Sequence, residues 1–250
     1  MSRCLVLGAP AQDGGGRAAN IAHALERLGV DVALLAGAPG GATPPGLDDA
    51  AAGCELLVLV AEAAGEAMTA AAGWIDGRRA AATDAPRLLV MLVPAGGGEI
   101  PGALWSVADV AVCGRSEAAA VTGLDVDDPL DAEDAAVALL GLGPSVAVVT
   151  LGAEGAVVAR AGRATYLPPF TVEVVDPAGA GDVFCAALGL GMLEGLDNFA
   201  ATGYAMAAAA VSIGRPGSAE SMPSRDDVER MAHSVDLRHD PGTLPVEFPR

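Results

Sequence analysis

Residues 174–184 read VVDPAGAGDVF, and this stretch predicts a turn of small residues followed by the first turn of a helix. The helical pattern continues to about Glu194, with apolar positions spaced for burial of one face. A helix start presents unpaired backbone N–H groups and the positive end of its dipole, and Gly179, Ala180 and Gly181 leave the space above them open. We therefore expect an anion-binding site at this corner.

Asp182 lies in the same helical turn. A carboxylate in a first turn can simply offset the helix dipole. Beside a phosphoryl group it can instead take the proton of an attacking hydroxyl, while the N–H groups bind the developing negative charge. Taken alone, this stretch leaves both roles open.

Composition limits the classes of protein to which the chain can belong. Its 250 residues, 52% of them apolar, are enough for one sizeable α/β domain. The net charge of −18 argues against nucleic acid or an anionic membrane surface as a partner. All fourteen basic residues are Arg, which excludes a Walker-A loop and a Schiff-base lysine. Any phosphate chemistry must therefore use backbone amides, Arg and metal ions.

The four cysteines indicate a reducing compartment. They lie far apart in apolar runs, without a Cys-x-x-Cys pair, so we expect buried free thiols rather than disulfides or a zinc site. We see no signal peptide and no apolar run of spanning length, and we therefore expect a cytoplasmic protein.

The N-terminal part predicts a β-α-β unit. An apolar strand at 3–8 leads into a turn and a helix to about Leu28, and a second strand follows at 32–36. The glycines in the turn do not have the Gly-x-Gly-x-x-Gly spacing of a dinucleotide site. Asp13 and Asn20 instead provide the acceptors and the donor that suit vicinal hydroxyls, and the glycines let a sugar ring approach the backbone.

Together, two motifs resemble the ribokinase-like (PfkB-type) carbohydrate kinases. That family carries Gly-Gly-x-x-x-Asn-x-Ala early in the chain, matched at residues 15–22, and Asp-Thr-x-Gly-Ala-Gly-Asp later, matched at 176–182 except for Pro177 in place of Thr. The resemblance implies that Asp182 is the general base. It also implies that the backbone from Gly179 to Asp182 is the anion hole.

The resemblance assigns substrate contacts to the N-terminal half. Asp13, Gly15, Gly16 and Asn20 match positions that bind sugar hydroxyls, although Asp13 and Asn20 can also be an ordinary turn residue and helix residue. Arg17 faces either solvent or a substrate phosphate. An acidic residue often reaches the sugar at the place of Glu62, which can also be a solvent-exposed residue before a helix.

The resemblance also assigns nucleotide and metal contacts. The family places a Thr-x-Gly-x-x-Gly loop beside the nucleotide phosphates, and an Asn-x-x-Glu segment organises water around Mg²⁺. Glu117 is present in that segment but Gly114 replaces the Asn, so Glu117 can also be a plain first-turn carboxylate. A later loop holds a monovalent cation such as K⁺. The positions matched are Thr150, Gly152, Gly155 and Gly217 for the nucleotide and Glu117, Asp176 and Ser221 for the ions. A plain tight hairpin is the alternative for the loop that begins at Thr150.

We predict an α/β fold of three α/β/α layers around a mostly parallel sheet, with a ribokinase-like domain over 1–232 and an extension over 233–250. Further strands are expected at 56–60, 88–93, 109–112 and 145–150, with a hairpin of 156–160 and 164–167. Further helices are expected at 65–82, 131–140 and 198–212. Relative to the family, the sequence has no room for the lid strands between Asp13 and Gly15, and the loop 37–46 replaces several dozen residues.

The predicted reaction is transfer of the γ-phosphoryl group of ATP, with Mg²⁺, to a hydroxymethyl group of a sugar, sugar phosphate or nucleoside. One alternative is a non-catalytic descendant of the fold that binds a small molecule or partner, which the missing lid and Gly114 would favour. Another is a lidless kinase of a heteroaromatic alcohol. The partner is expected to be a small molecule, with a homodimer left open.

Overall fold

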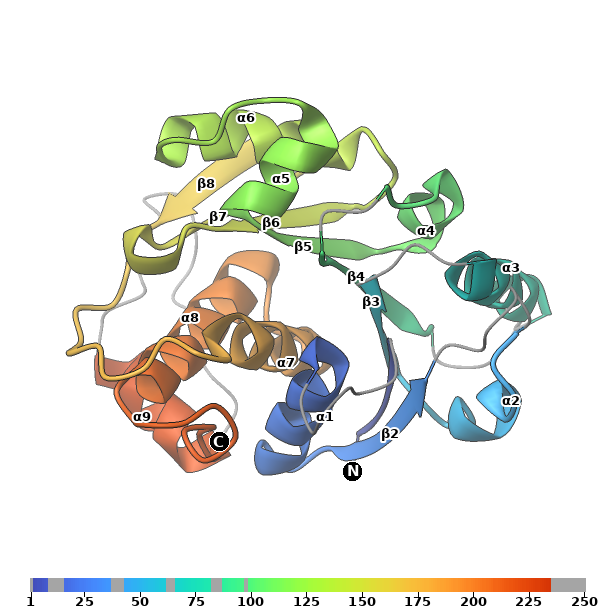
Figure 1. Cartoon of the computed structure of the whole chain (residues 1–250), viewed down its shortest axis with the longest axis horizontal. Helices are drawn as coiled ribbons and strands as arrows, with labels where there is room; N and C mark the ends of the chain where they lie inside the picture. Colours follow the sequence, from blue (N-terminus) through green and yellow to red (C-terminus); the bar gives the residue numbers. More distant parts are fainter. Residues whose placement is uncertain are drawn as a thin grey trace.

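The computed structural model describes residues 2–8, 16–36, 43–61, 66–81, 87–96 and 99–234. Its strands form one eight-stranded sheet with the order β2-β1-β3-β4-β5-β6-β7-β8 (Figure 1). The strands are β1 (Arg3–Gly8), β2 (Asp31–Ala36), β3 (Leu56–Ala61), β4 (Leu89–Pro94), β5 (Val110–Gly114), β6 (Val146–Thr150), β7 (Ala156–Arg160) and β8 (Arg163–Leu167). Pairing is parallel from β2 through β6, and β7 and β8 are antiparallel.

Helices cover both faces of the sheet, which confirms the predicted three-layer α/β/α architecture (Figure 1). The helices are α1 (Arg17–Arg27), α2 (Leu47–Ala50), α3 (Glu66–Ala81), α4 (Gly102–Val107), α5 (Arg115–Thr122), α6 (Pro129–Leu140), α7 (Ala180–Leu193), α8 (Asn198–Ile213) and α9 (Arg225–Ser234). One buried cluster joins the sheet to α1, α7, α8 and α9, and a second joins it to α2, α3, α4, α5 and α6. Along the central strands, such as β1, β3 and β5, side chains alternate between the two clusters, as the pleat requires.

The central helix α7 is buried on all sides, so the prediction that it buries one face was wrong. Every residue from Asp182 to Gly191 is buried. The reason is its position, because α7 lies between the sheet, α1 and α8. Small residues allow this packing: a Cβ atom on Gly189 would lie only 2.6 Å from Cδ2 of Leu56.

Most predicted elements agree with the structure to within one or two residues. Helix α6 begins at Pro129 rather than at 131, because Asp128 caps it. Among the described helices, α2, α4 and α9 were not predicted, and α5 was anticipated only in the alternative that Glu117 is a first-turn carboxylate; α2 and α4 are short, and half of the residues of α9 are charged. Helix α9 runs two residues past the predicted domain end at 232, and this boundary stays a prediction because 235–250 lie outside the described residues.

The expected absence of a lid also stays a prediction. All strands in the part of the chain that the structure describes belong to the single sheet. The segments 9–15 and 37–42, where the shortening was expected, are outside the described residues.

All four cysteines are buried and free, as the sequence predicted. Burial, as the first cause, raises the pKa of the Cys185 thiol to about 12. Among the described residues, none of the helices combines the length and the apolar character that a membrane crossing needs.

The topology determines where a ligand can bind. Strand β1 pairs with β2 on one side and with β3 on the other, so the chain changes direction across the sheet at β1. In open α/β sheets, ligands bind outside the carboxyl ends of the strands at such a switch point. The first residues of α1 lie at this place in the fold.

Candidate active site

Asp182 lies in the first turn of α7, close to the switch point. Gly179 is the N-cap residue of this helix, with φ of +77°, a conformation that favours glycine. A Cβ atom on Gly179 would also lie 2.9 Å from Oγ of Ser218. The amide of Asp182 donates to the carbonyl of Gly179 at 3.0 Å, and that of Ala180 donates to Pro177 at 3.3 Å. The turn therefore depends on glycine at 179, whereas the role of this backbone as an anion hole stays a prediction.

Two side chains of α1 hold the Asp182 carboxylate. Nε of Arg17 donates to Oδ1 at 3.1 Å, and Nδ2 of Asn20 donates to Oδ2 at 2.8 Å. Arg17 and Asn20 are three residues apart, so they lie on the same face of the helix. The carboxylate is only 8% exposed, yet it is paired and hydrogen-bonded rather than packed into apolar core. The sequence motifs near residues 16–20 and 176–182 thus meet at one place.

Arg17 also connects the Asp182 carboxylate to the end of β4 and to α5, the helix that follows β5. Its NH1 group donates to the carbonyl of Pro94, the last residue of β4, at 3.3 Å, and lies 3.7 Å from Oε1 of Glu117 on α5. Burial by itself would lower the pKa of the Arg17 guanidinium, but Cys185 and the Asp182 and Glu117 carboxylates raise it above its ordinary value. Arg17 is therefore a permanent cation between two acidic side chains.

Glu117 folds back over the end of β5. Its Oε2 atom accepts a hydrogen bond of 3.1 Å from Oγ of Ser116. A Cβ atom on Gly114 would lie 2.6 Å from the same Oε2 atom. The glycine that replaces the family's Asn thus leaves the space that the Glu117 carboxylate occupies.

The loop predicted to lie beside nucleotide phosphates follows β6. Thr150 pairs with Gly114 across the sheet, so this loop and Glu117 begin at the same edge. Gly152 and Gly155 both have positive φ, and a Cβ on Gly155 would collide with the carbonyl of Leu167. The turn 152–154 is a short 3₁₀ helix, which leads into the predicted hairpin.

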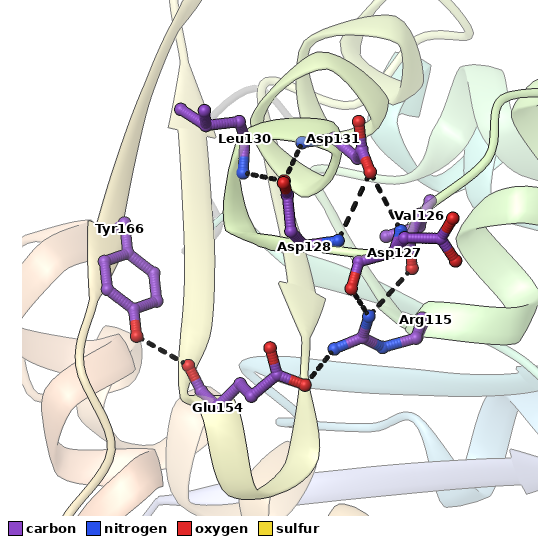
Figure 2. Close-up of polar contacts among 8 residues, drawn as sticks. All are labelled: Arg115, Val126, Asp127, Asp128, Leu130, Asp131, Glu154 and Tyr166. Carbon is purple, nitrogen blue, oxygen red and sulfur yellow. Dashed lines mark hydrogen bonds and ion pairs between the residues drawn. The ribbon is translucent and has the colours of Figure 1, made fainter.

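Arg115 ties this loop to the start of α5 (Figure 2). Its guanidinium donates to Oε1 of Glu154 at 2.7 Å and to the carbonyls of Val126 and Asp127. On the other side, the hydroxyl of Tyr166 donates to the carbonyl of Glu154 at 2.8 Å. Sequence reasoning missed Arg115, because only the fold brings it to a residue 39 positions away.

The loop predicted to hold a monovalent cation contacts Asp176. The carboxylate of Asp176 accepts from the amides of Ala178 at 2.9 Å and Gly217 at 3.1 Å. Ser221 is fully buried, and its hydroxyl contacts Oγ of Ser212 and the carbonyl of Ser218, both at 3.1 Å. Within the described part of the chain, no group of three or more His, Cys, Asp or Glu residues could hold a metal ion.

Of the predicted substrate residues, Gly16 is the N-cap of α1, and its carbonyl accepts from the amide of Asn20 at 3.0 Å. Asp13, Gly15 and Glu62 lie outside the described residues, so their roles stay predictions. The carbonyl of Pro94 is a contact that no sequence signal indicated.

Comparison with known proteins identifies the family of this chain. The model of the pfkB family of carbohydrate kinases matches residues 79–225, more than half of the chain. The ribokinase of Haemophilus influenzae is 32% identical over 146 residues, which are 58% of this chain and 48% of that protein. The chain thus spans about half the length of this curated relative.

Solved structures show the same fold. A ribokinase of Arabidopsis thaliana, complexed with ribose and ATP, has a TM-score of 0.75 at 18% identity, covering 92% of this chain and 98% of that one. Ribokinase from Thermotoga maritima has a TM-score of 0.72 at 20% identity, with coverage of 93% and 100%. Phosphofructokinase-2 from Escherichia coli, in complex with potassium, has a TM-score of 0.72 at 16% identity, with coverage of 96% and 100%. The chain belongs to the pfkB family of carbohydrate kinases.

Proposed function

We propose that the protein transfers the γ-phosphoryl group of ATP to a hydroxymethyl group of a sugar, sugar phosphate or nucleoside. The observation that carries the proposal is the contact between the two motifs: Asp182 at the start of α7 is held by Arg17 and Asn20 at the start of α1. A proton acceptor, a cation and a sugar-binding motif therefore share one corner. Ribokinases with ribose and ATP, and with ATP and Mg²⁺, are among the proteins of similar fold.

The residues present suit the chemistry. Asp182 accepts the proton of the acceptor hydroxyl, whose oxygen forms a bond to the γ-phosphorus while the bond to the leaving ADP oxygen breaks. The positive end of the α7 dipole and the Arg17 guanidinium, which pairs with Asp182, supply positive charge beside the transferring group. The amide nitrogen of Asn20 is engaged by Asp182, so its carbonyl oxygen is the atom that accepts from a substrate hydroxyl.

ATP and Mg²⁺ fit the donors around the site. Magnesium typically binds one or two carboxylates together with substrate phosphates, and Glu117 is the carboxylate at the end of β5. When bound, Mg²⁺ neutralises phosphate charge, which a chain with a net charge of −18 would otherwise repel. We also propose a small-molecule partner and a cytoplasmic location, as the sequence suggested.

The test is ADP formation with Mg²⁺–ATP and a panel of sugars, sugar phosphates, nucleosides and hydroxymethyl heteroaromatic alcohols. We expect turnover of at least one sugar or nucleoside, and a loss of about 10²–10⁴-fold in D182N, because Asn cannot accept the proton. D226N is the matched control, since it makes the same change at an exposed residue of α9. Turnover of no acceptor by a folded wild-type protein would contradict the proposal and favour a non-catalytic binding protein, and turnover of only the heteroaromatic alcohols would replace the acceptor class.

A further inference from the structure

The Arg17 guanidinium lies between two carboxylates that belong to different parts of the proposed centre. It makes a hydrogen-bonded ion pair with Asp182 at 3.1 Å and a longer ion pair with Glu117 at 3.7 Å. The side chain of Glu117 is 23% exposed, whereas that of Asp182 is 8% exposed. The contact with Glu117 is therefore the looser and more accessible of the two.

Gly114 is what allows Glu117 to approach Arg17. A Cβ atom at this position would lie 2.6 Å from Oε2 of Glu117, too close for the present carboxylate position. The backbone of Gly114 has φ of −73° and ψ of 171°, an extended conformation that any residue adopts. Glycine is thus needed here for space and not for backbone conformation.

We propose that Arg17 is an internal counter-cation, which holds Glu117 in the nucleotide-free protein and gives it up when Mg²⁺–nucleotide binds. This inference rests on the proposed kinase function and adds a regulatory step to the same site. Glu117 cannot be fully paired with both cations, because a divalent ion at its carboxylate repels the guanidinium.

The surroundings favour this exchange. After losing Glu117, Arg17 keeps its hydrogen bonds to Asp182 and to the carbonyl of Pro94, so the guanidinium stays in place. Glu117 also borders a cavity of about 480 Å³ that is lined by Pro94, Trp105 and Val121 among others. The carboxylate therefore has room to move away from Arg17.

The test is binding of Mn²⁺, a probe for the magnesium site, to the nucleotide-free protein by calorimetry. R17Q removes the competing charge, so we expect Mn²⁺ to bind about fivefold more tightly than to the wild type. The gain should vanish in R17Q/E117Q, because Glu117 is the group released. Unchanged or weaker Mn²⁺ binding in R17Q, or a gain that persists in R17Q/E117Q, would overturn the inference.

G114A tests the role of the glycine. The added methyl group displaces Glu117 from Arg17, so R17Q should raise Mn²⁺ affinity less in the G114A background than in the wild type. G77A is the matched control, because a Cβ at Gly77 on α3 meets nothing within 4 Å, and it should leave the effect of R17Q unchanged. An equal effect of R17Q in both backgrounds would contradict the role of Gly114.

A second substitution at Arg17, together with the kinase assay, makes the outcomes distinguishable. If R17Q does not fold, R17K replaces it. The ammonium group of lysine is a point charge, so it cannot contact Asp182 and Glu117 together as the planar guanidinium does. We then expect a smaller gain of the same sign. Because the readout is metal binding, a protein that behaves as expected here but phosphorylates no acceptor contradicts the proposed function alone. An active kinase without the R17Q gain contradicts this inference alone.

Discussion

Gly8, the last residue of β1, determines how closely α1 approaches the sheet, and G8A tests this packing. A Cβ atom on Gly8 would lie 2.5 Å from Cβ of Ala18 and 3.3 Å from Cβ of Val60. Carbon atoms in contact are normally about 3.5–4.0 Å apart, so the start of α1 must move by roughly 1 Å. Ala18, which the added methyl group would strike, lies one residue from Arg17 and two residues from Asn20 in α1.

Overpacking of this kind costs about 1–3 kcal/mol of the free energy of unfolding. At about 2 kcal/mol, the melting temperature should fall by roughly 4–8 °C in a domain of this size. Turnover should also fall by about tenfold or more, because the residues that hold Asp182 move with the helix. Urea denaturation gives the free energy, and ADP formation gives the turnover.

A second substitution makes the reasoning refutable. A18G removes the methyl group that G8A would strike, so G8A should cost much less in the A18G background than in the wild type. G77A again serves as the control and should be neutral or stabilising, since Gly77 lies in an open part of α3. If G8A left the protein unchanged, or if A18G did not reduce its effect, our account of the α1 packing would be refuted.

Three other predictions follow from single contacts. D128A should lower the free energy of unfolding by about 1 kcal/mol in urea, because Oδ1 of Asp128 caps the amides of Leu130 and Asp131 at the start of α6, whereas D128S should be nearly neutral (Figure 2). Burial opposes ionisation of Asp227, but hydrogen bonds from Ser224 and Arg215 lower its pKa to about 2. Because the pKa of Asp227 in the folded protein is below the unfolded value of about 3.9, the ionised carboxylate stabilises the fold by at most about 2 kcal/mol above pH 4, and this stabilisation is lost as the pH falls to 2. The difference in the free energy of unfolding between wild type and D227N should therefore shrink over that range. A constant difference would contradict the pairing. All four thiols should react slowly with a disulfide reagent at pH 8 and rapidly after unfolding in guanidinium, since each is buried, and fast reaction of the native protein would show an opening that the structure lacks.

The sequence alone was sufficient for the strands, for most of the long helices and for the start of α7. Apolar runs locate the strands, and small residues before an apolar helix locate the start of α7, because these signals act over a few neighbouring residues. No helix was predicted at α9, because half of its ten residues are charged and its few apolar residues are buried only by packing against α8. Local signals also fail for the burial of α7, since a local pattern does not say how many partners surround a helix.

Only the tertiary structure decided which side chains meet. Arg17 and Asn20 reach Asp182 across 165 and 162 positions of sequence, and the sheet order is what brings the starts of α1 and α7 together. From the sequence, Gly114 is recognised as standing where the family has Asn. Only the tertiary structure shows that the Glu117 carboxylate lies where a side chain at position 114 would be, and that it pairs with Arg17. Local elements follow from neighbouring residues, whereas a site depends on long-range packing, where a displacement of 1 Å decides whether two groups are in contact.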